Sequence, residues 1–316
     1  MKNNNKHIKL AAVAVMSLIL LAGCTELPGK QAAKNDVEQN TSESISQNIG
    51  EAIKQELGKA AAGVEKVVED SATKIVQDVK ANGISKDYSA TQKVDSSSVL
   101  SIENSVGEIE VTTIAGDHIN VSATILAHNS SNHESDLQEI LDNAEISIKA
   151  NGDNLKVFTS SKLSPKKDLW TWAQDKYGYS DFSISYVIQV PNSIEMYQIT
   201  NNVGQIYLHD IKGTYRVVSN VGAIRIEGAH IIGKSSVESN TGSIRLDIDE
   251  MESGSSLKAK TDVGSLSAVL DDDVKCSVEA KSELGHITGV TNGKADFNGG
   301  GPLLSLSSEI GAITVQ

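Results

Sequence analysis

The sequence predicts a mainly β fold, namely a single-stranded β-helix or β-solenoid over residues 94–316. Two observations lead to this prediction. From Val94 onward, short runs of Ile and Val alternate with polar residues, and Ser, Thr, Asn and Gly separate the runs, which is typical of β-strands. A short motif centred on glycine also recurs at nearly constant spacing, and such self-similarity indicates a repeat architecture.

Each copy of the motif has Val, Leu, Ile or Thr before the glycine and Ile or Leu two residues after it. From Gly204 on, the glycines are 18, 20, 22, 21 and 26 residues apart, and about 20 residues is the length of one solenoid coil. We expect the residue before each glycine and the second one after it to point inward, and the third one after it to point outward. The seven glycines are Gly107, Gly204, Gly222, Gly242, Gly264, Gly285 and Gly311.

Gly107 and Gly204 are 97 residues apart, and the interval between them contains other elements. Alternation predicts strands at 119–126 and 182–190, and apolar spacing predicts a short helix over 134–143. Two further runs, 145–149 and 155–159, predict a hairpin around Asn151-Gly152-Asp153-Asn154. Residues 161–181 carry turn-forming residues and lysines, and we expect a loop there.

Three of these elements together resemble the putative-adhesin β-strand-repeat family, a bacterial domain of unknown function. They are the hairpin that continues into Leu155-Lys156-Val157, the strand from Tyr186 to Pro191, and the Val-Gly-x-Ile motifs. The resemblance covers residues 94–316 and implies a β-helix-like solenoid at the cell envelope. It supplies no catalytic residues, and the segments before residue 94 lie outside it.

The first 23 residues predict a lipoprotein signal peptide. Three lysines precede an apolar run, residues 10–20, that is too short to span a bilayer. Leu21-Ala22-Gly23-Cys24 follows and matches the bacterial lipobox, so Cys24 is the expected attachment site of acyl chains such as palmitate. The alternative is a plain secretory signal that happens to end in Cys. Two or more acyl chains anchor a protein stably, which predicts an extracytoplasmic protein held on the outer face of the cell membrane.

Two segments join the predicted anchor to the repeats. Residues 24–43 are polar and show no periodicity, and we expect a flexible, lipid-anchored tether. Residues 44–82 carry apolar side chains every three to four positions, from Ile45 to Val79, which predicts an amphipathic helix or two helices broken near Gly58 or Gly63. A spacer that rests on its own domain and a coiled coil that binds a partner are both open for this segment.

The composition argues against several classes of function. The formal net charge is −13, and it becomes −16 when the signal peptide with its three lysines is removed. Binding to nucleic acid or anionic lipid depends on Lys and Arg, so we expect no nucleic-acid partner and a membrane contact through the N-terminal lipid. Once Cys24 is acylated, the one remaining thiol is Cys276, and we expect it in the core. No nucleotide-binding or hydrolase fingerprint occurs, and no cofactor is predicted.

Two sets of side chains are candidates for binding. Seven of the twelve aromatic residues fall between Trp170 and Tyr197, and aromatic faces stack on sugars and anchor protein contacts. The alternative is that this loop covers one end of the solenoid and buries its own rings. Arg225 and Arg245 are the second set, because they would stack outward on adjacent coils. The predicted binding surface consists of Trp170, Trp172, Tyr177, Tyr179, Arg225 and Arg245.

Other polar residues favour structural roles, and no metal site is predicted. The segment with His128 and His133 lacks the spacing of zinc ligands. Stacked acids could share Ca²⁺ through oxygen ligands, but a solvated acidic edge is favoured over this. Asparagines two residues before three of the glycines predict an amide ladder that closes the turns. The acids are Asp262, Glu283 and Glu309, and the asparagines are Asn202, Asn220 and Asn240.

These observations predict a non-enzymatic lipoprotein of the cell envelope that serves surface interaction, adhesion or envelope scaffolding. The expected partner is a cell-wall glycan or an envelope protein. One alternative is an accessory sensor of envelope stress beside a membrane partner. The other is a glycan-active β-helix enzyme, which would require a groove that contains converging acids together with Arg225 and Arg245.

Overall fold

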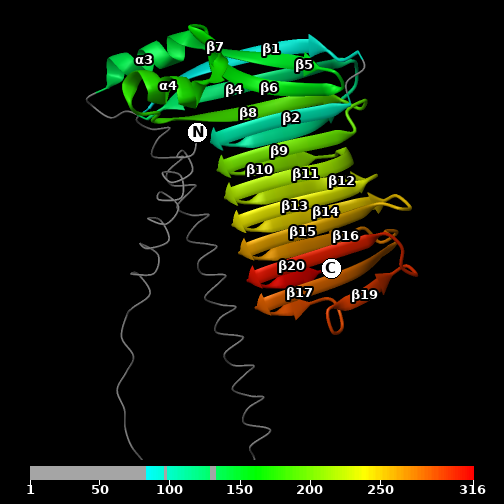
Figure 1. The fold of residues 1–316 in the computed structure, drawn as a ribbon. Coiled ribbons are helices and arrows are strands. Elements are labelled where there is room, and N and C mark those ends of the chain that lie inside the picture. The colour runs from blue at the N-terminus through cyan, green and yellow to red at the C-terminus, as the bar shows by residue number, and fades with distance from the viewer. Residues whose placement is uncertain (1–82, 96–97, 129–132) are drawn as a thin grey trace, which may run out of the picture. The chain divides into compact units, whose positions relative to one another are not determined.

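The computed structural model describes residues 83–95, 98–128 and 133–316, and this part of the chain is mainly β (Figure 1). It contains 21 strands and two short helices. The predicted signal peptide (1–23) with Cys24, the tether (24–43) and the amphipathic segment (44–82) lie outside the described residues. No helix in the described part is long and apolar enough to cross a membrane.

Most strands belong to two ladders of parallel strands that face each other across the core. A strand of the first ladder leads through a corner glycine into a strand of the second, and we call each such pair a rung. The first ladder consists of β2 (Val99–Val106), β9 (Met196–Val203), β11 (Lys212–Val221), β13 (Lys234–Thr241), β15 (Ser256–Val263), β20 (Leu303–Ile310) and β17 (Cys276–Leu284). The second consists of β3 (Ile109–Ile114), β10 (Ile206–His209), β12 (Ile224–Ile231), β14 (Ile244–Met251), β16 (Leu266–Leu270), β21 (Ile313–Val315) and β18 (Ile287–Thr288).

The rungs do not stack in chain order at the C-terminal end. β20 pairs with β15 on one side and with β17 on the other, so Ile310 aligns with both Val263 and Leu284. The last rung of the chain therefore lies between the two rungs that precede it. The short strand β19 (Lys294–Phe297) pairs antiparallel with β17.

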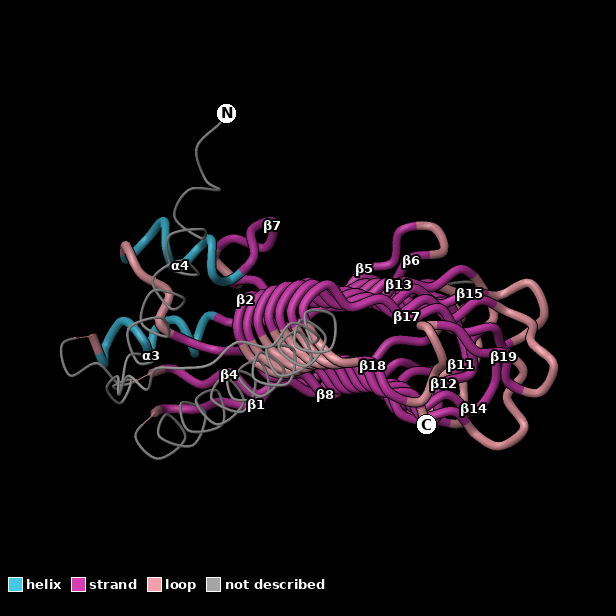
Figure 2. Tube along the Cα trace, turned by 90° about the horizontal axis from the view of Figure 1, so that it is seen from below, coloured by secondary structure: helices cyan, strands magenta, loops and turns pink. Residues whose placement is uncertain are grey.

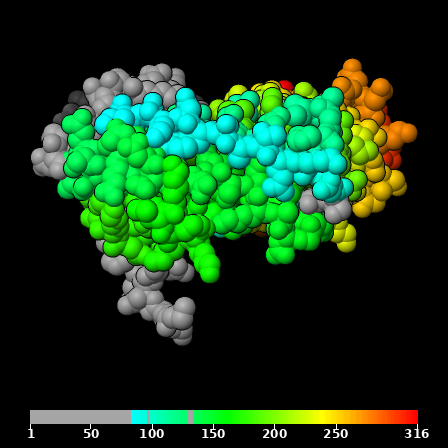
Figure 3. Space-filling view, turned by 90° about the horizontal axis from the view of Figure 1, so that it is seen from above, coloured from blue at the N-terminus to red at the C-terminus, as the bar shows by residue number. Residues whose placement is uncertain are grey.

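A cap of antiparallel strands and both helices covers the other end, above β2 and β3 (Figures 1 and 3). The predicted helix, hairpin and two strands of this region are present, whereas the predicted loop at 161–181 folds into a strand and a helix. β1 also lies in this sheet, ahead of Val94. The cap consists of β1 (Ile84–Lys93), β4 (His118–Ala127), α3 (Glu134–Asn143), β5 (Ala144–Asn151), β6 (Asn154–Ser161), β7 (Ser164–Asp168), α4 (Leu169–Tyr177) and β8 (Phe182–Pro191).

The core lies between the two ladders, which appear as two superposed rows of strands when the stack is seen end-on (Figure 2). The second residue after each corner glycine points inward, as predicted. These side chains are at most 1% exposed on six of the seven rungs, and the seventh, Ile287 on the rung at the lower end of the stack, is half-buried. Cys276 is fully buried in the same core, as expected. The six buried residues are Ile109, Ile206, Ile224, Ile244, Leu266 and Ile313.

The residue before each corner glycine does not point inward, and the prediction for this position was wrong. Val203 is 45% exposed and Leu284 is 47% exposed. The reason is that the chain turns one residue earlier. In the first ladder, Asn201 pairs with Ser219 and Val203 pairs with Val221, but Asn202 and Asn220 do not take part in the strand pairing.

The corners are closed by three kinds of contact. Gly222 has φ +136, and a Cβ there would lie 2.0 Å from the carbonyl oxygen of Gly204, so only glycine fits. Buried polar side chains donate to the glycine carbonyls of the neighbouring rung, as Asn201 does to Gly107 at 2.8 Å and Thr261 to Gly242 at 3.0 Å. The predicted amide ladder is present, because Asn220 donates to Asn202 and Asn240 donates to Asn220, at 2.8 and 3.1 Å.

Candidate binding surfaces

Helix α4 holds the aromatic residues that the sequence singled out. The Asp168 side chain caps its N-terminus by accepting from the backbone N–H of Thr171 at 2.8 Å, and Gly178 ends it with φ +82. Trp172 is buried, whereas Trp170 is half-buried and stacks on Phe182 with a centroid distance of 5.4 Å. The helix therefore uses much of its aromatic surface to cover the end of the core.

The remaining rings of this cluster connect α4 to α3. Tyr179 packs against His133 at 4.4 Å between centroids, and its hydroxyl donates to Asp136 at 2.9 Å. Burial, helped by this hydrogen bond, raises the pKa of Tyr179 to about 12. Lys176 pairs with Glu139 of α3, and this hydrogen bond holds the pKa of Glu139 below its usual value. These contacts join the two helices into one unit at the cap.

The rings of Tyr177 and Tyr179 lie 6.1 Å apart, and Trp172 meets Tyr177 edge to face at 5.8 Å. The ammonium of Lys176 lies 4.8 Å from the ring centre of Tyr177. The four aromatic residues of the predicted surface thus lie on α4 and in the turn that follows it. Trp170, Tyr177 and Tyr179 are half-buried, and Trp172 is buried.

Arg225 and Arg245 lie elsewhere, on the outer surface of the second ladder. They are aligned neighbours on β12 and β14, and their side chains are 48% and 49% exposed. Tyr207 of β10 aligns with Arg225 on the other side, and the guanidinium lies 5.7 Å from its ring centre. We call Tyr207, Arg225 and Arg245 the arginine row. Strand β3 separates it from β8, the nearest strand of the cap.

A second row runs beside the arginine row, two residues further along each strand. Arg225 lies 3.9 Å from Glu227, and Arg245 lies 3.2 Å from Asp247. His209 stacks parallel to Tyr207 at 6.2 Å and lies 3.3 Å from Glu227. Sequence reasoning named the two arginines and missed His209, Glu227 and Asp247, although alternation places all of them on the same surface.

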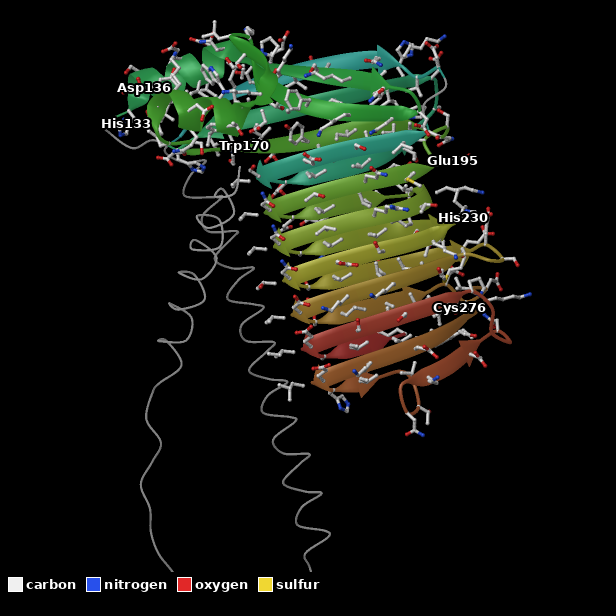
Figure 4. All side chains as sticks on the ribbon, viewed as in Figure 1. His133, Asp136, Trp170, Glu195, His230 and Cys276 are labelled. Atoms are coloured by element: carbon white, nitrogen blue, oxygen red, sulfur yellow. The ribbon has the colours of Figure 1, made fainter. Side chains whose placement is uncertain are left out.

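At the far end of the rungs, His230 lies between two glutamates, 3.2 Å from Glu250 and 3.3 Å from Glu252. Lys212 also pairs with Glu252 at 2.8 Å, and this hydrogen bond lowers the pKa of Glu252. Figure 4 shows His230 at the opposite end of the strands from Trp170 and Asp136. The structure therefore presents three separate polar or aromatic clusters, and Arg225 and Arg245 belong to a different one from the tryptophans.

The acids near the corner glycines are occupied by lysines. Lys260 lies 2.6 Å from Asp262 and 3.0 Å from Glu309, and Lys281 lies 3.5 Å from Glu283. The two carboxylates raise the pKa of Lys260 well above its usual value through hydrogen bonds. In the described residues, His, Cys, Asp and Glu form no group of three that could hold a metal ion.

Comparisons with known proteins identify no family. No family model and no curated protein matches this chain. Among solved structures, a putative cell adhesion protein from Clostridium sporogenes aligns with 73% of this chain and 99% of its own length, at 12% identity and a TM-score of 0.40. A putative adhesin from Bacteroides fragilis aligns with 73% of this chain and 97% of its own, at 15% identity and a TM-score of 0.28.

A third solved structure, described as a putative lipid binding protein from Parabacteroides distasonis, aligns with 74% of this chain and 98% of its own length. Its identity is 11% and its TM-score is 0.29. TM-scores this low carry no statement about the function of this chain. The chain is thus similar, at a distance, to bacterial proteins described as putative adhesins.

Proposed function

We propose that this chain is a non-enzymatic lipoprotein of the cell envelope that binds cell-wall glycan with the outer surface of its second ladder. The observation that carries the proposal is the arginine row, with the acids and the histidine beside it. The row combines an aromatic ring, two guanidinium groups and their carboxylate neighbours on one exposed surface. These are the groups that stack on sugar rings and exchange hydrogen bonds with sugar hydroxyls.

The regular spacing of the row supports a repeating ligand. Aligned residues on neighbouring parallel strands lie about 4.8 Å apart, so equivalent side chains repeat along the stack. Arg225 and Arg245 are aligned in this way. The planar guanidinium donates several hydrogen bonds in a fixed geometry. Two guanidinium groups side by side therefore suit a polymer better than a single small molecule.

The β-solenoid is part of the same proposal. Its support is the succession of rungs, each made of a strand, a corner glycine and a second strand, with parallel register from rung to rung. Such stacking creates long surfaces on which outward residues are repeated. These surfaces give a protein of this size an extended contact area without a deep pocket.

The lipid anchor at Cys24 rests on the sequence Leu21-Ala22-Gly23-Cys24. It places the protein on the outer face of the membrane, where cell-wall glycan is accessible. Its test is metabolic labelling with an alkyne analogue of palmitate in cells that express the protein or Cys24→Ala. Labelled wild type in the membrane fraction and unlabelled variant support the anchor, and an unlabelled wild type contradicts it.

The binding function is tested by co-sedimentation of the full-length protein, in mild detergent, with purified cell-wall sacculi. Arg225→Gln combined with Arg245→Gln should lower the affinity about tenfold or more, since a loss of about 1.4 kcal/mol corresponds to a factor of ten. Arg216→Gln is the matched control, because Arg216 is exposed on β11 of the first ladder. Equal sedimentation of all three proteins contradicts the proposal, and release of soluble glycan fragments by wild type would favour the enzyme.

A further inference from the structure

The corner glycines lie one above another along the stack and form one edge of it, which we call the glycine corner. A stripe of mainly apolar side chains runs along the outside of this edge. It consists of the residues that directly precede the corner glycines, and six of the seven are Val, Leu or Ile. Three are between 38% and 47% exposed, namely Ile310, Val203 and Leu284, and the others are half-buried. In order along the stack, this corner stripe is Val106, Val203, Val221, Thr241, Val263, Ile310 and Leu284.

The corner stripe is a continuous strip and not a set of scattered residues. Each member is paired in register with the next, as Val221 is with Val203 on one side and Thr241 on the other. Six steps of about 4.8 Å give a length of about 29 Å. Contiguous exposed apolar surface of this kind usually marks a site of interaction.

The neighbouring position on each rung, one residue earlier in the sequence, is polar. Polar residues are therefore accommodated at this corner, and the stripe itself could have been polar. The residue that precedes each member of the stripe is Ser105 on the first rung, Asn on the next three and acidic on the lower three, as in Asn220 and Glu309. An apolar row that points away from the core contributes nothing to the packing between the ladders. Its repetition on six rungs therefore calls for a partner on the outside.

A segment of this chain has the right length and pattern for that partner. Residues 60–82 carry apolar side chains at positions 64, 68, 72, 75 and 79, which is helical spacing. A helix of about 20 residues is about 29 Å long, because each residue adds 1.5 Å. One face of such a helix would cover the corner stripe from end to end.

The point at which this segment joins the fold also fits. It leads directly into β1, whose first residue, Ile84, pairs with Ala127 of β4, and Ala127 pairs with Phe182 at the start of β8. Four residues later in β8, Tyr186 pairs with Ile109, just past the first corner glycine. Ile84, the first residue of β1, therefore lies on the side of the glycine corner, above the upper end of the corner stripe.

We propose that residues 60–82 dock on the corner stripe as an amphipathic helix, running from Leu284 at their N-terminal end to Val106 at their C-terminal end. In this register, Val79 lies at Val106 and Ala72 lies at Val221. Lys59 then lies beside the acidic lower rungs that carry Glu283 and Glu309. Opposite charges then meet at the acidic lower end of the strip.

Disulfide trapping in the full-length protein tests this docking. Ala72→Cys with Val221→Cys places two thiols in the proposed contact, and a disulfide requires Cα atoms within about 4.4–6.8 Å. Asp70→Cys with Val221→Cys is the matched control, because residue 70 lies on the opposite side of the helix from residue 72. With diamide as the oxidant, the first pair should form an intramolecular disulfide roughly tenfold faster than the control, owing to the higher effective concentration.

A second pair, Val76→Cys with Val203→Cys, tests the register independently one rung higher and should close as fast as the first. The crosslinks are located by mass spectrometry of the digested monomer. Equal rates for the contact and control pairs would overturn the proposal. So would rapid formation of disulfide-linked dimers by Val221→Cys alone, which would assign the corner stripe to a second copy of the chain.

Discussion

The cap and the ladders build the same core by opposite means. In the ladders, Ile206, Ile224 and Ile244 form one row, in which each residue meets its counterpart from the next rung. In the cap, a contact such as that between Trp170 and Phe182 is made once and between unlike residues. The ladders thus gain stability from like residues that meet from rung to rung, including the stacked Tyr197 and Tyr215, and the cap from contacts between unlike side chains that close the end of the stack.

Because of this difference, the two regions have different roles in the structure. A repeated surface can present the same side chain at regular spacing, which the arginine row does. A cap has to end the repeat and protect its last apolar layer, and α3 and α4 do so with buried Leu137, Ile140, Leu141 and Trp172. Substitutions in the two regions should therefore differ in the size of their effects.

The largest effect is expected for Ile224→Asp in the ladders. Ile224 is 1% exposed, so the substitution buries a carboxylate without a partner, and it should lower the free energy of unfolding by about 4 kcal/mol. Arg225→Ser, one residue further along the same strand, should change it by less than about 0.5 kcal/mol. Urea unfolding followed by circular dichroism measures both. A small effect of Ile224→Asp would mean that the inward register is wrong.

The second-largest effect is expected when a corner glycine is replaced by alanine, and a glycine of the cap serves as the comparison. Gly222 and Gly178 both have positive φ, but a Cβ on Gly222 would meet the Gly204 carbonyl at 2.0 Å, whereas nothing lies within 4 Å of one on Gly178. Gly178→Ala should cost about 1 kcal/mol from backbone conformation alone, and Gly222→Ala about 3 kcal/mol because the rungs must also separate. The same unfolding measurement gives the difference, and equal costs would show that the corners do not pack as closely as described.

Stability should also fall at alkaline pH. Burial raises the pKa of Cys276 to about 11 and raises the pKa values of Tyr186, Tyr197 and Tyr215 above the usual range. The unfolded chain then loses these protons at lower pH than the folded chain does, so the stability present below about pH 8.5 is lost as pH rises. We expect a loss of about 2 kcal/mol by pH 10. Thermal unfolding between pH 7 and pH 10.5 measures it, and Cys276→Ala should remove most of the loss up to pH 10, because the unfolded thiol loses its proton at a lower pH than the unfolded tyrosines do.

The smallest effect is expected for Tyr179→Phe in the cap. It removes the hydrogen bond to Asp136 that joins the two helices, at a cost of about 1 kcal/mol. Hydrogen exchange should become faster in α3 and stay unchanged in the strands of the ladders. Faster exchange throughout the ladders would show that the cap and the ladders unfold as one unit.

The mainly β fold could be predicted from the sequence because its signals are local. Spacing of glycines and alternation of Ile and Val predicted the rungs, and the second residue after each glycine, such as Ile224, points inward as expected. The predicted helix at 134–143 and the hairpin at 145–159 are also present. These elements depend on patterns within ten or twenty residues, which a sequence displays directly.

The features that sequence reasoning missed depend on contacts between distant residues. The corner turns at Asn202 and its equivalents, so that Val203 points outward against simple alternation. The insertion of β20 between β15 and β17 has no local signal. Helix α4 was expected to be a loop because turn-formers precede it, although Asp168 and Gly178 provide recognisable caps. Among the candidate site residues, the sequence could name Arg225 and Trp170 but not show that they lie on separate surfaces.

The most direct test of whether the ladders or the cap bind cell-wall glycan is to compare the two regions in one binding assay. Purified sacculi are titrated with the full-length protein carrying Tyr207→Ser with Arg225→Gln in the ladders, or Trp170→Ala in the cap. If the ladders bind the glycan, the ladder variant should bind at least about tenfold more weakly than wild type, while the affinity of the cap variant should stay within about twofold of that of wild type. Loss of binding by the cap variant, with the ladder variant unchanged, would contradict it.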